Sequence, residues 1–258
     1  MSYKIISFTN AGYFDFCQNW YLTIRKAGIT NDILVYCLDE KSIDLCNEYN
    51  IPCKPWLSES QFGYSPEEFV VQGSKQWGPS RIPFKKLEII NHVLSQGDDI
   101  LYSDTDVVFL RDPSDEFQTD KMLLIQPEGK QKIMLCSGFF YVKSTPATVN
   151  LTQVSESLIK GFTMDQPLLN SRIKYSDPGR YPKVYKGTKQ QTYRNGWIED
   201  NTLTWGTLSH KTFPAGGPWL QKKRYINNTY VIHYNCIHGK ENKINKMRED
   251  KNWYVDVL

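Results

Sequence analysis

Short runs of apolar residues alternate with segments of helical periodicity through the first half of the chain. Continuous apolar runs of this kind are typical of buried strands, and they predict strands at residues 4–8, 33–38 and 99–110. Between these runs, apolar side chains recur every three or four residues, which predicts helices at residues 14–24, 42–49 and 83–97. Strands separated by helices are typical of parallel sheets with helices on both faces. We therefore expect an α/β fold with a mostly parallel central sheet flanked by helices.

The second half of the chain has a more mixed pattern. The elements expected there are strands at 122–125, 134–142 and 230–232, a helix at 145–160 and another from residue 165. Residues 52–78 and the stretch after Tyr175 carry glycine and proline without a clear period, which predicts loops. No composition shift or linker divides the chain, so we expect a single domain over residues 1–258.

The composition excludes several classes of protein. With 258 residues, 40% hydrophobic and 23% charged, the chain matches a globular protein and not a disordered one. Its formal net charge of +3 is too balanced for a nucleic-acid binder that relies on a basic surface. We expect no signal peptide at Met1, and no apolar run approaches the roughly 18–20 residues of a membrane span. The six cysteines form no CxxC pair, so we expect reduced thiols in a cytoplasmic protein without an integral membrane segment.

An acidic pair, Asp104 and Asp106, interrupts the apolar run at 99–110. Two ionised carboxylates beside buried strand residues are costly unless a partner compensates them. A divalent cation such as Mn²⁺ or Mg²⁺ resolves this conflict, because it takes carboxylate oxygens and shares its remaining positions with phosphates. The alternative is that the strand ends here and both aspartates lie in a solvated turn. The chain has no glycine-rich phosphate loop, so an anionic ligand is expected to depend on metal and lysines.

Further candidate residues lie near the C-terminus. His233 follows the apolar run at 230–232, and imidazole is a common metal ligand. His238 is a rival for this role, and either histidine is also compatible with an ordinary surface position. Gly239 allows close backbone approach and Lys243 offers a positive charge to a phosphate, although a solvated basic tail on a C-terminal helix explains them equally well.

Five sequence blocks and this C-terminal segment occur in an order that resembles the nucleotide-diphospho-sugar transferase group around glycosyltransferase family 77. The blocks are PFKKL at 83–87, LYSDTDVVFLRDP at 101–113, CSGFFYV at 136–142, DQPLL at 165–169 and FPAGG at 213–217, followed by HYN at 233–235 with Gly239 and Lys243. The C-terminal segment departs from the motif of glycosyltransferase family 8, which reads HxxGxxKPW. Here Gly239 and Lys243 lie farther from His233, and Ile244 and Asn245 follow Lys243.

The resemblance implies a fold, an activity and a set of roles. It implies a GT-A domain with a nucleotide-binding half (1–113) and a half that binds sugar and acceptor (114–258). It also implies a metal-dependent transferase that moves a sugar from a nucleoside diphosphate, expected to be UDP, to a hydroxyl acceptor with retained configuration. The implied ligands of the Mn²⁺ or Mg²⁺ ion are Asp104, Asp106 and His233. The implied donor contacts are Thr9, Asn10, Lys85, Asp104, Ser137, Gly138, Gly239 and Lys243.

Asp165 and Gln166 are the implied catalytic pair, because a carboxylate or amide must meet the positive charge that develops on the transferred sugar. An alternative role for both is the cap and first turn of the helix that begins at residue 165. Aromatic residues in polar segments are candidate acceptor contacts: Trp77, Trp197, Trp205 and Trp219.

Two other functions compete with this interpretation. A sugar nucleotidyltransferase would carry a glycine-rich basic loop after the first strand, and residues 8–12 lack one. A non-catalytic carbohydrate-binding protein on a transferase scaffold would be favoured by loss of an acidic position, and both Asp104 and Asp106 are present.

Overall fold

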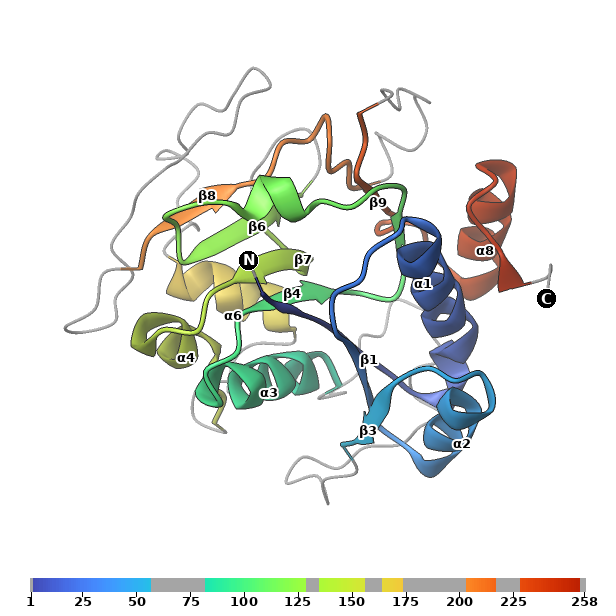
Figure 1. Ribbon diagram of the computed structural model, residues 1–258, viewed down its shortest axis with the longest axis horizontal. Helices are drawn as coiled ribbons and strands as arrows, with labels where there is room; N and C mark the ends of the chain where they lie inside the picture. Colours follow the sequence, from blue (N-terminus) through green and yellow to red (C-terminus); the bar gives the residue numbers. More distant parts are fainter. Residues whose placement is uncertain are drawn as a thin grey trace.

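A seven-stranded sheet occupies the centre of the computed structural model, which describes residues 2–56, 82–128, 135–155, 164–173, 203–216 and 228–255 (Figure 1). The strand order is β3-β2-β1-β4-β7-β6-β8. The strands are β1 (Lys4–Thr9), β2 (Ile33–Cys37), β3 (Cys53–Pro55), β4 (Ile100–Ser103), β6 (Leu123–Pro127), β7 (Leu135–Val142) and β8 (Trp205–Thr207). Only β7 is antiparallel to its neighbours, and the other pairs are parallel. The predicted mostly parallel α/β sheet is therefore confirmed.

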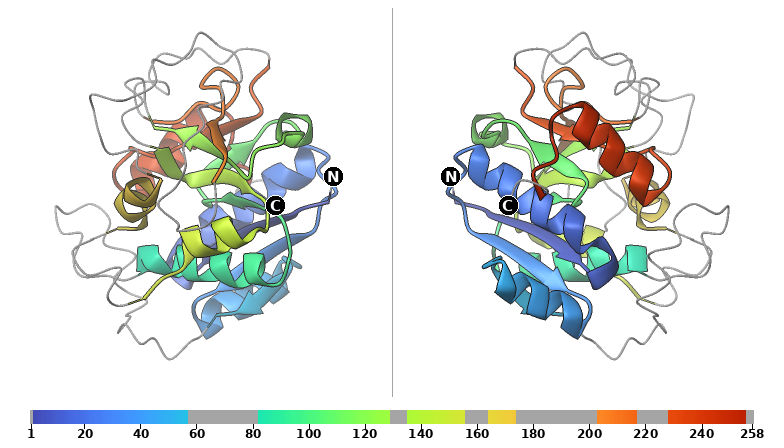
Figure 2. Two further views of the ribbon diagram at one scale, coloured as in Figure 1. Left: turned by 90° about the vertical axis from the view of Figure 1, so that its left-hand side faces the viewer. Right: turned by 90° about the vertical axis from the view of Figure 1, so that its right-hand side faces the viewer.

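Helices cover both faces of this sheet (Figures 1 and 2). The face covered by α1 (Phe14–Lys26) and α2 (Glu40–Glu48) buries Ile5, whereas the face covered by α3 (Ile82–Ser95), α4 (Pro146–Thr152) and α6 (Asp165–Arg172) buries Ile6. Successive strand residues point to opposite faces, so a continuous apolar run supplies both layers of core at once. This explains why the sequence shows apolar runs and not alternation.

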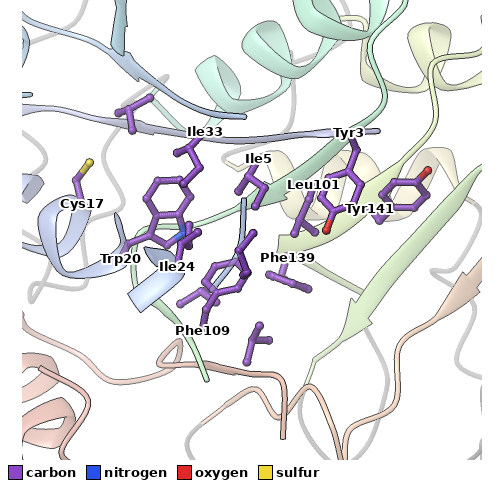
Figure 3. Packing of buried hydrophobic residues seen from close by; sticks show 14 of the residues in the cluster. Tyr3, Ile5, Cys17, Trp20, Ile24, Ile33, Leu101, Phe109, Phe139 and Tyr141 are labelled. Atoms are coloured by element: carbon purple, nitrogen blue, oxygen red, sulfur yellow. The ribbon is translucent and has the colours of Figure 1, made fainter. Parts of the chain in front are cut away.

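The core under α1 reaches the end of β4. Cys17, Trp20 and Ile24 follow one another at helical spacing and belong to the same buried cluster as Ile5 and Leu101 (Figure 3). The helix ends as predicted before Gly28, whose φ of +74° is accessible to glycine at low cost. The buried Trp20 Nε1 donates a hydrogen bond of 3.0 Å to Ser103 Oγ. The packed core therefore holds the residue that directly precedes Asp104.

The predicted single strand at 99–110 is wrong. The chain leaves the central sheet after Ser103 and turns through residues 104–106. It then forms β5 (Val107–Phe109), which pairs antiparallel with β9 (Val231–His233) in a separate two-stranded sheet. The turn is held by three backbone hydrogen bonds: from Asp104 N to Gly138 O at 2.7 Å, from Val107 N to Asp104 O at 3.2 Å and from Tyr234 N to Asp106 O at 3.0 Å. Charged carboxylates cannot lie between two covered faces of a sheet, and the turn moves them to its edge.

Other boundaries differ from the predictions. The expected loop at 52–78 begins with the short strand β3, which adds to β2, and residues 57–81 lie outside the described part. The helix expected at 145–160 is wrong in length, because α4 ends at Thr152. The last carbonyl oxygens of α4 find partners in neighbouring side chains. Asn91 donates a hydrogen bond of 2.6 Å to Val149 O, and Arg172 donates one of 2.6 Å to Leu151 O.

The C-terminal segment forms α8 (Lys240–Glu249), which packs Ile244 and Met247 against Phe16 of α1 and Ile232 of β9. Two 3₁₀ turns complete the described elements, η1 (Ala11–Tyr13) after β1 and η3 (Ser114–Phe117) after β5. Among the described residues, no helix is both long and apolar enough to cross a lipid bilayer.

Candidate active site

Two carboxylates and an imidazole converge beside the turn between β4 and β5. His233 is paired with Val107 in the β5–β9 ladder, which brings its ring to the acidic turn. His233 Nε2 lies 3.1 Å from Asp106 Oδ1 and 4.0 Å from Asp104 Oδ2, and one ligand atom from each of the three residues lies within 4.8 Å of the others. The structure thus brings together the three residues that the sequence analysis named as metal ligands. A donor set of two carboxylate oxygens and one imidazole nitrogen suits Mn²⁺ or Mg²⁺ with positions left for phosphate oxygens.

Gln126 determines which ring nitrogen of His233 faces the carboxylates. Its amide nitrogen donates to the carbonyl oxygens of Phe213 at 3.0 Å and Pro214 at 3.3 Å. The amide oxygen must therefore face His233 Nδ1, 2.9 Å away, and accept its hydrogen bond. This leaves Nε2 directed at Asp106 and available to a cation. Sequence analysis missed Gln126, although a glutamine within the apolar segment 122–127 is a signal for a buried hydrogen-bond partner.

Charge in the site is balanced by buried cations from distant segments. Burial raises the pKa of Asp106, but Lys243 and His233 outweigh it, so the net pKa is lowered and the carboxylate is ionised. Burial lowers the pKa of His233, but Cys136 and Asp106 more than reverse this, so its pKa is raised well above the usual value. Lys243, on α8, donates to Asp106 Oδ2 at 2.6 Å. A divalent cation would replace the proton of His233 Nε2 as the counter-charge of the two carboxylates.

A second ionic group surrounds Lys86 on α3. Its Nζ lies 3.0 Å from Asp104 Oδ1 and 3.2 Å from Asp165 Oδ2, and it donates to Ser137 O at 3.3 Å. Burial lowers the pKa of Lys86, but Asp104 and Asp165 outweigh burial, so the net pKa is raised and the amine stays charged. Lys85, which the sequence analysis favoured, instead pairs with Glu88 Oε2 at 2.7 Å. One residue is about 100° around a helix, so only tertiary packing decides which of two adjacent lysines enters the site.

The residues expected to line the donor-sugar pocket also meet here. Gln166 Oε1 accepts a hydrogen bond of 3.1 Å from Ser137 N, and Gln166 Nε2 donates to Glu128. Met164, and not Asp165, is the N-cap of α6, and it has no side-chain capping bond. Asp165 therefore lies in the first turn of α6, as the alternative predicts, but it does not cap the helix. Its carboxylate, 3% exposed, is directed at Lys86.

Gly138 lets the backbone of β7 pass directly beneath the metal-ligand cluster. A Cβ atom added there would lie 2.5 Å from Asp104 Oδ2 and would overlap the His233 ring. Contacts this close require neighbouring groups to move. A glycine at this position is thus a steric condition for bringing Asp104 and His233 together.

We expect Gly138→Ala to disrupt the cluster more than it disrupts the fold. Overpacking in a buried site costs about 1–3 kcal/mol, and here the displaced groups are the metal ligands. The measurement is Mn²⁺ affinity together with thermal unfolding. Gly97→Ala is the matched control, because a Cβ there meets nothing within 4 Å and only its φ of +91° is strained. Equal Mn²⁺ affinity in the two variants would contradict this role for Gly138.

The remaining predicted residues lie around the cluster with different roles. Asn10, at the end of β1, uses Oδ1 to accept from Tyr13 N at 3.1 Å and so caps η1, and the adjacent Thr9 is buried. Gly239 begins α8 with a φ of +87°. Lys240 Nζ donates to Gly12 O at 3.1 Å, which holds the start of α8 next to η1. The end of β1, η1 and the start of α8 therefore lie side by side next to the metal-ligand cluster, and we call this segment the rim.

The structure distinguishes between the two candidate histidines and places one of the four candidate tryptophans. His233 is buried in the cluster, whereas His238 is exposed and does not contribute to the metal-ligand group. Trp205 is fully buried in the core, so its predicted acceptor contact is wrong. The other candidate acceptor contacts lie outside the described residues: Trp77, Trp197 and Trp219.

Comparison with known proteins places these residues in a family context. The sequence pattern of the family described as "Nucleotide-diphospho-sugar transferase" matches residues 28–247. The chain is 22% identical to a UDP-galactose:fucoside alpha-3-galactosyltransferase of Dictyostelium discoideum over 98% of this chain and 43% of the relative. It is 25% identical to the UDP-D-xylose:L-fucose alpha-1,3-D-xylosyltransferase MGP4 of Arabidopsis thaliana over 95% of this chain and 68% of the relative.

Solved structures share the fold. The galactosyltransferase LgtC, crystallised with donor and acceptor sugar analogues, superposes with a TM-score of 0.56 at 14% identity, covering 99% of this chain and 96% of LgtC. The glycosyltransferase GlyE of Streptococcus pneumoniae superposes with a TM-score of 0.52 at 11% identity, covering 98% of this chain and 64% of GlyE. The chain spans 43% and 64% of the length of the first two curated relatives that it matches.

Proposed function

This chain belongs to the nucleotide-diphospho-sugar transferase family, and from this premise we propose that it is a metal-dependent glycosyltransferase. It moves a sugar from a UDP-sugar to a hydroxyl acceptor and retains the anomeric configuration. The observation that carries the proposal is the convergence of Asp104, Asp106 and His233 within 4.8 Å at the edge of the sheet. The names of two relatives specify UDP-galactose and UDP-D-xylose as donors, which supports a UDP-sugar donor here.

The proposed roles follow from the charge that develops when the bond to the diphosphate breaks. A bound Mn²⁺ or Mg²⁺ ion would supply Lewis-acid stabilisation of the leaving diphosphate. Asp104, Asp106 and His233 hold and orient that ion. Lys243, 2.6 Å from Asp106, adds a positive charge on the side of α8, where the diphosphate can approach it. Thr9, Asn10 and Gly239 border the nucleotide from the rim.

The donor sugar is proposed to lie toward Ser137, Gly138, Asp165 and Gln166. Lys86 holds the carboxylates of Asp104 and Asp165 in a fixed relation, whereas Lys85, predicted to contact the donor, pairs with Glu88. The negative charge of Asp165 then opposes the positive charge that develops on the sugar. Asp104, Asp106 and Asp165 are all paired with cations, so none of them is suited to deprotonate an acceptor hydroxyl. This supports retention of configuration.

A donor screen tests the proposed function. Purified protein is incubated with Mn²⁺ and UDP-galactose, UDP-xylose, UDP-glucose or UDP-N-acetylglucosamine, with and without a methyl L-fucoside, and released UDP is measured. Acceptor-dependent release with at least one donor is expected. Pyrophosphate release from UTP and a sugar 1-phosphate would support a nucleotidyltransferase instead. Sugar binding without turnover of any donor would support a binding protein and contradict the proposal.

His233→Ala is expected to lower Mn²⁺ affinity by at least about tenfold, because loss of an outer-shell partner alone costs about 10–100-fold. The control is His238→Ala, which removes an exposed imidazole five residues away and should leave Mn²⁺ affinity unchanged. Mn²⁺ binding is measured by calorimetry on both variants, with circular dichroism to verify the fold. A larger loss of Mn²⁺ affinity in His238→Ala than in His233→Ala would show that His233 is the wrong histidine.

A further inference from the structure

Four cysteines that are scattered in the sequence meet on the α1 side of the sheet. Cys37 ends β2, Cys46 lies in α2 and Cys53 begins β3, and their Sγ atoms all lie within 4.8 Å of one another. Cys37 and Cys46 are in contact, with 3.6 Å between their sulfurs. Cys17 of α1, at the left margin of the packed cluster in Figure 3, lies against Cys46. We call Cys17, Cys37, Cys46 and Cys53 the cysteine cluster.

The spacing of the sulfurs matches a metal coordination sphere. A zinc–sulfur bond of about 2.3 Å places the sulfurs of a tetrahedral site roughly 3.8 Å apart. The observed contact of 3.6 Å and the limit of 4.8 Å bracket this value. A disulfide would use only two of the four sulfurs and would need an oxidant. Convergence of the three sulfurs of Cys37, Cys46 and Cys53 within 4.8 Å is better explained by a single ion that takes several thiolates.

Access and chemistry agree with this geometry. Cys37 and Cys46 are buried, whereas Cys53 is partly exposed on the edge strand β3, which gives an ion a route from solvent. A free thiol ordinarily carries its proton at neutral pH, because the pKa of cysteine is about 8.5. A cation that binds thiolates would displace these protons into solvent.

We propose that the cysteine cluster binds one thiophilic metal ion such as Zn²⁺ through Cys37, Cys46 and Cys53, with Cys17 next to this ligand group. The site is separate from the carboxylate and imidazole cluster, which suits harder ions. It would join β2, α2 and β3. Asp39 caps α2 through Ser42 N at 2.7 Å and accepts from Ala11 N at 3.0 Å, so an ion that fixes α2 also supports the rim at η1.

Cadmium titration tests the proposal, because cadmium–thiolate bonds absorb in the near ultraviolet and carboxylate or imidazole ligands do not. The full chain is reduced, freed of metal with a chelator, and titrated with Cd²⁺ and, in competition with a chromophoric chelator, with Zn²⁺. We expect a charge-transfer band that saturates at one ion per chain, release of protons, and a higher unfolding temperature. Asp106→Asn should keep the band, which separates this site from the proposed catalytic one.

Two variants and one matched control complete the test. Cys53→Ser changes a partly exposed residue and is the variant best tolerated by the fold; it should weaken Cd²⁺ binding by more than the roughly 10–100-fold that loss of an outer-shell partner costs. Cys46→Ala should do the same, whereas Cys236→Ser, at an exposed cysteine outside the cluster, should match wild type. Absence of the band in the reduced wild-type chain, an unchanged affinity in Cys53→Ser, or a Cys37–Cys46 disulfide in protein purified without reductant would overturn the proposal.

Discussion

Asp106→Asn is expected to reduce sugar transfer by on the order of 10³-fold, the upper range for loss of one electrostatic stabiliser. Asparagine keeps the volume and hydrogen-bonding reach of aspartate but removes the charge that faces His233 Nε2 at 3.1 Å and Lys243 Nζ at 2.6 Å. Removing this charge weakens Mn²⁺ binding and leaves two cations facing each other. The measurement is UDP release at saturating donor, together with Mn²⁺ affinity.

Asparagine is the more informative substitution because alanine confuses two effects. Taking one partner from a buried ion pair costs about 3–5 kcal/mol of stability, so lost activity in Asp106→Ala would partly report unfolding. Asp115→Asn is the matched control, since it removes an exposed carboxylate of η3 away from the cluster. Full activity in Asp106→Asn, or full wild-type activity after removal of metal with EDTA, would contradict the metal assignment.

Asp165→Asn is expected to reduce turnover on the order of 10²–10³-fold, as for loss of one electrostatic stabiliser in the transition state. Affinity for free UDP should barely change, because that ligand lacks the sugar that Asp165 is proposed to face. The capping role no longer competes as an explanation, because Met164 occupies the N-cap position of α6. Turnover and UDP affinity are measured on the same preparation. Unchanged turnover would remove Asp165 from the reaction, and equal losses in both would place its effect at the diphosphate.

The structure adds an alternative that a double-mutant cycle resolves. Asp165 Oδ2 lies 3.2 Å from Lys86 Nζ, so the carboxylate could act only by holding that lysine. In that case Asp165→Asn should cost nothing further in a Lys86→Met background. If Asp165 instead acts on the sugar, its loss should persist in that background. Thermal unfolding of the single and double variants shows whether the buried charge left without its partner destabilises the fold.

Several features of this protein follow from the sequence by itself. The structure agrees with the apolar runs at 4–8 and 33–38, which form β1 and β2, and with the helical period before Gly28, which forms α1. The prediction succeeds there because local hydrophobic pattern and core burial favour the same structure. The family resemblance also came from ordered local blocks, and the match over residues 28–247 confirms it. The acidic interruption at 104–106 located the candidate site for an energetic reason that is readable without coordinates, since carboxylates are costly beside buried strands.

Only the tertiary structure decided how the distant pieces meet. It separated the run at 99–110 into strands of two sheets, because the pairing of β5 with β9 joins residues more than a hundred positions apart and leaves no local signal. It chose Lys86 over Lys85 through the rotation of α3 against the sheet. It also supplied Gln126 as the partner of His233 and gathered the cysteine cluster from α1, β2, α2 and β3. Each of these depends on distances between elements, which hydrophobic period does not encode.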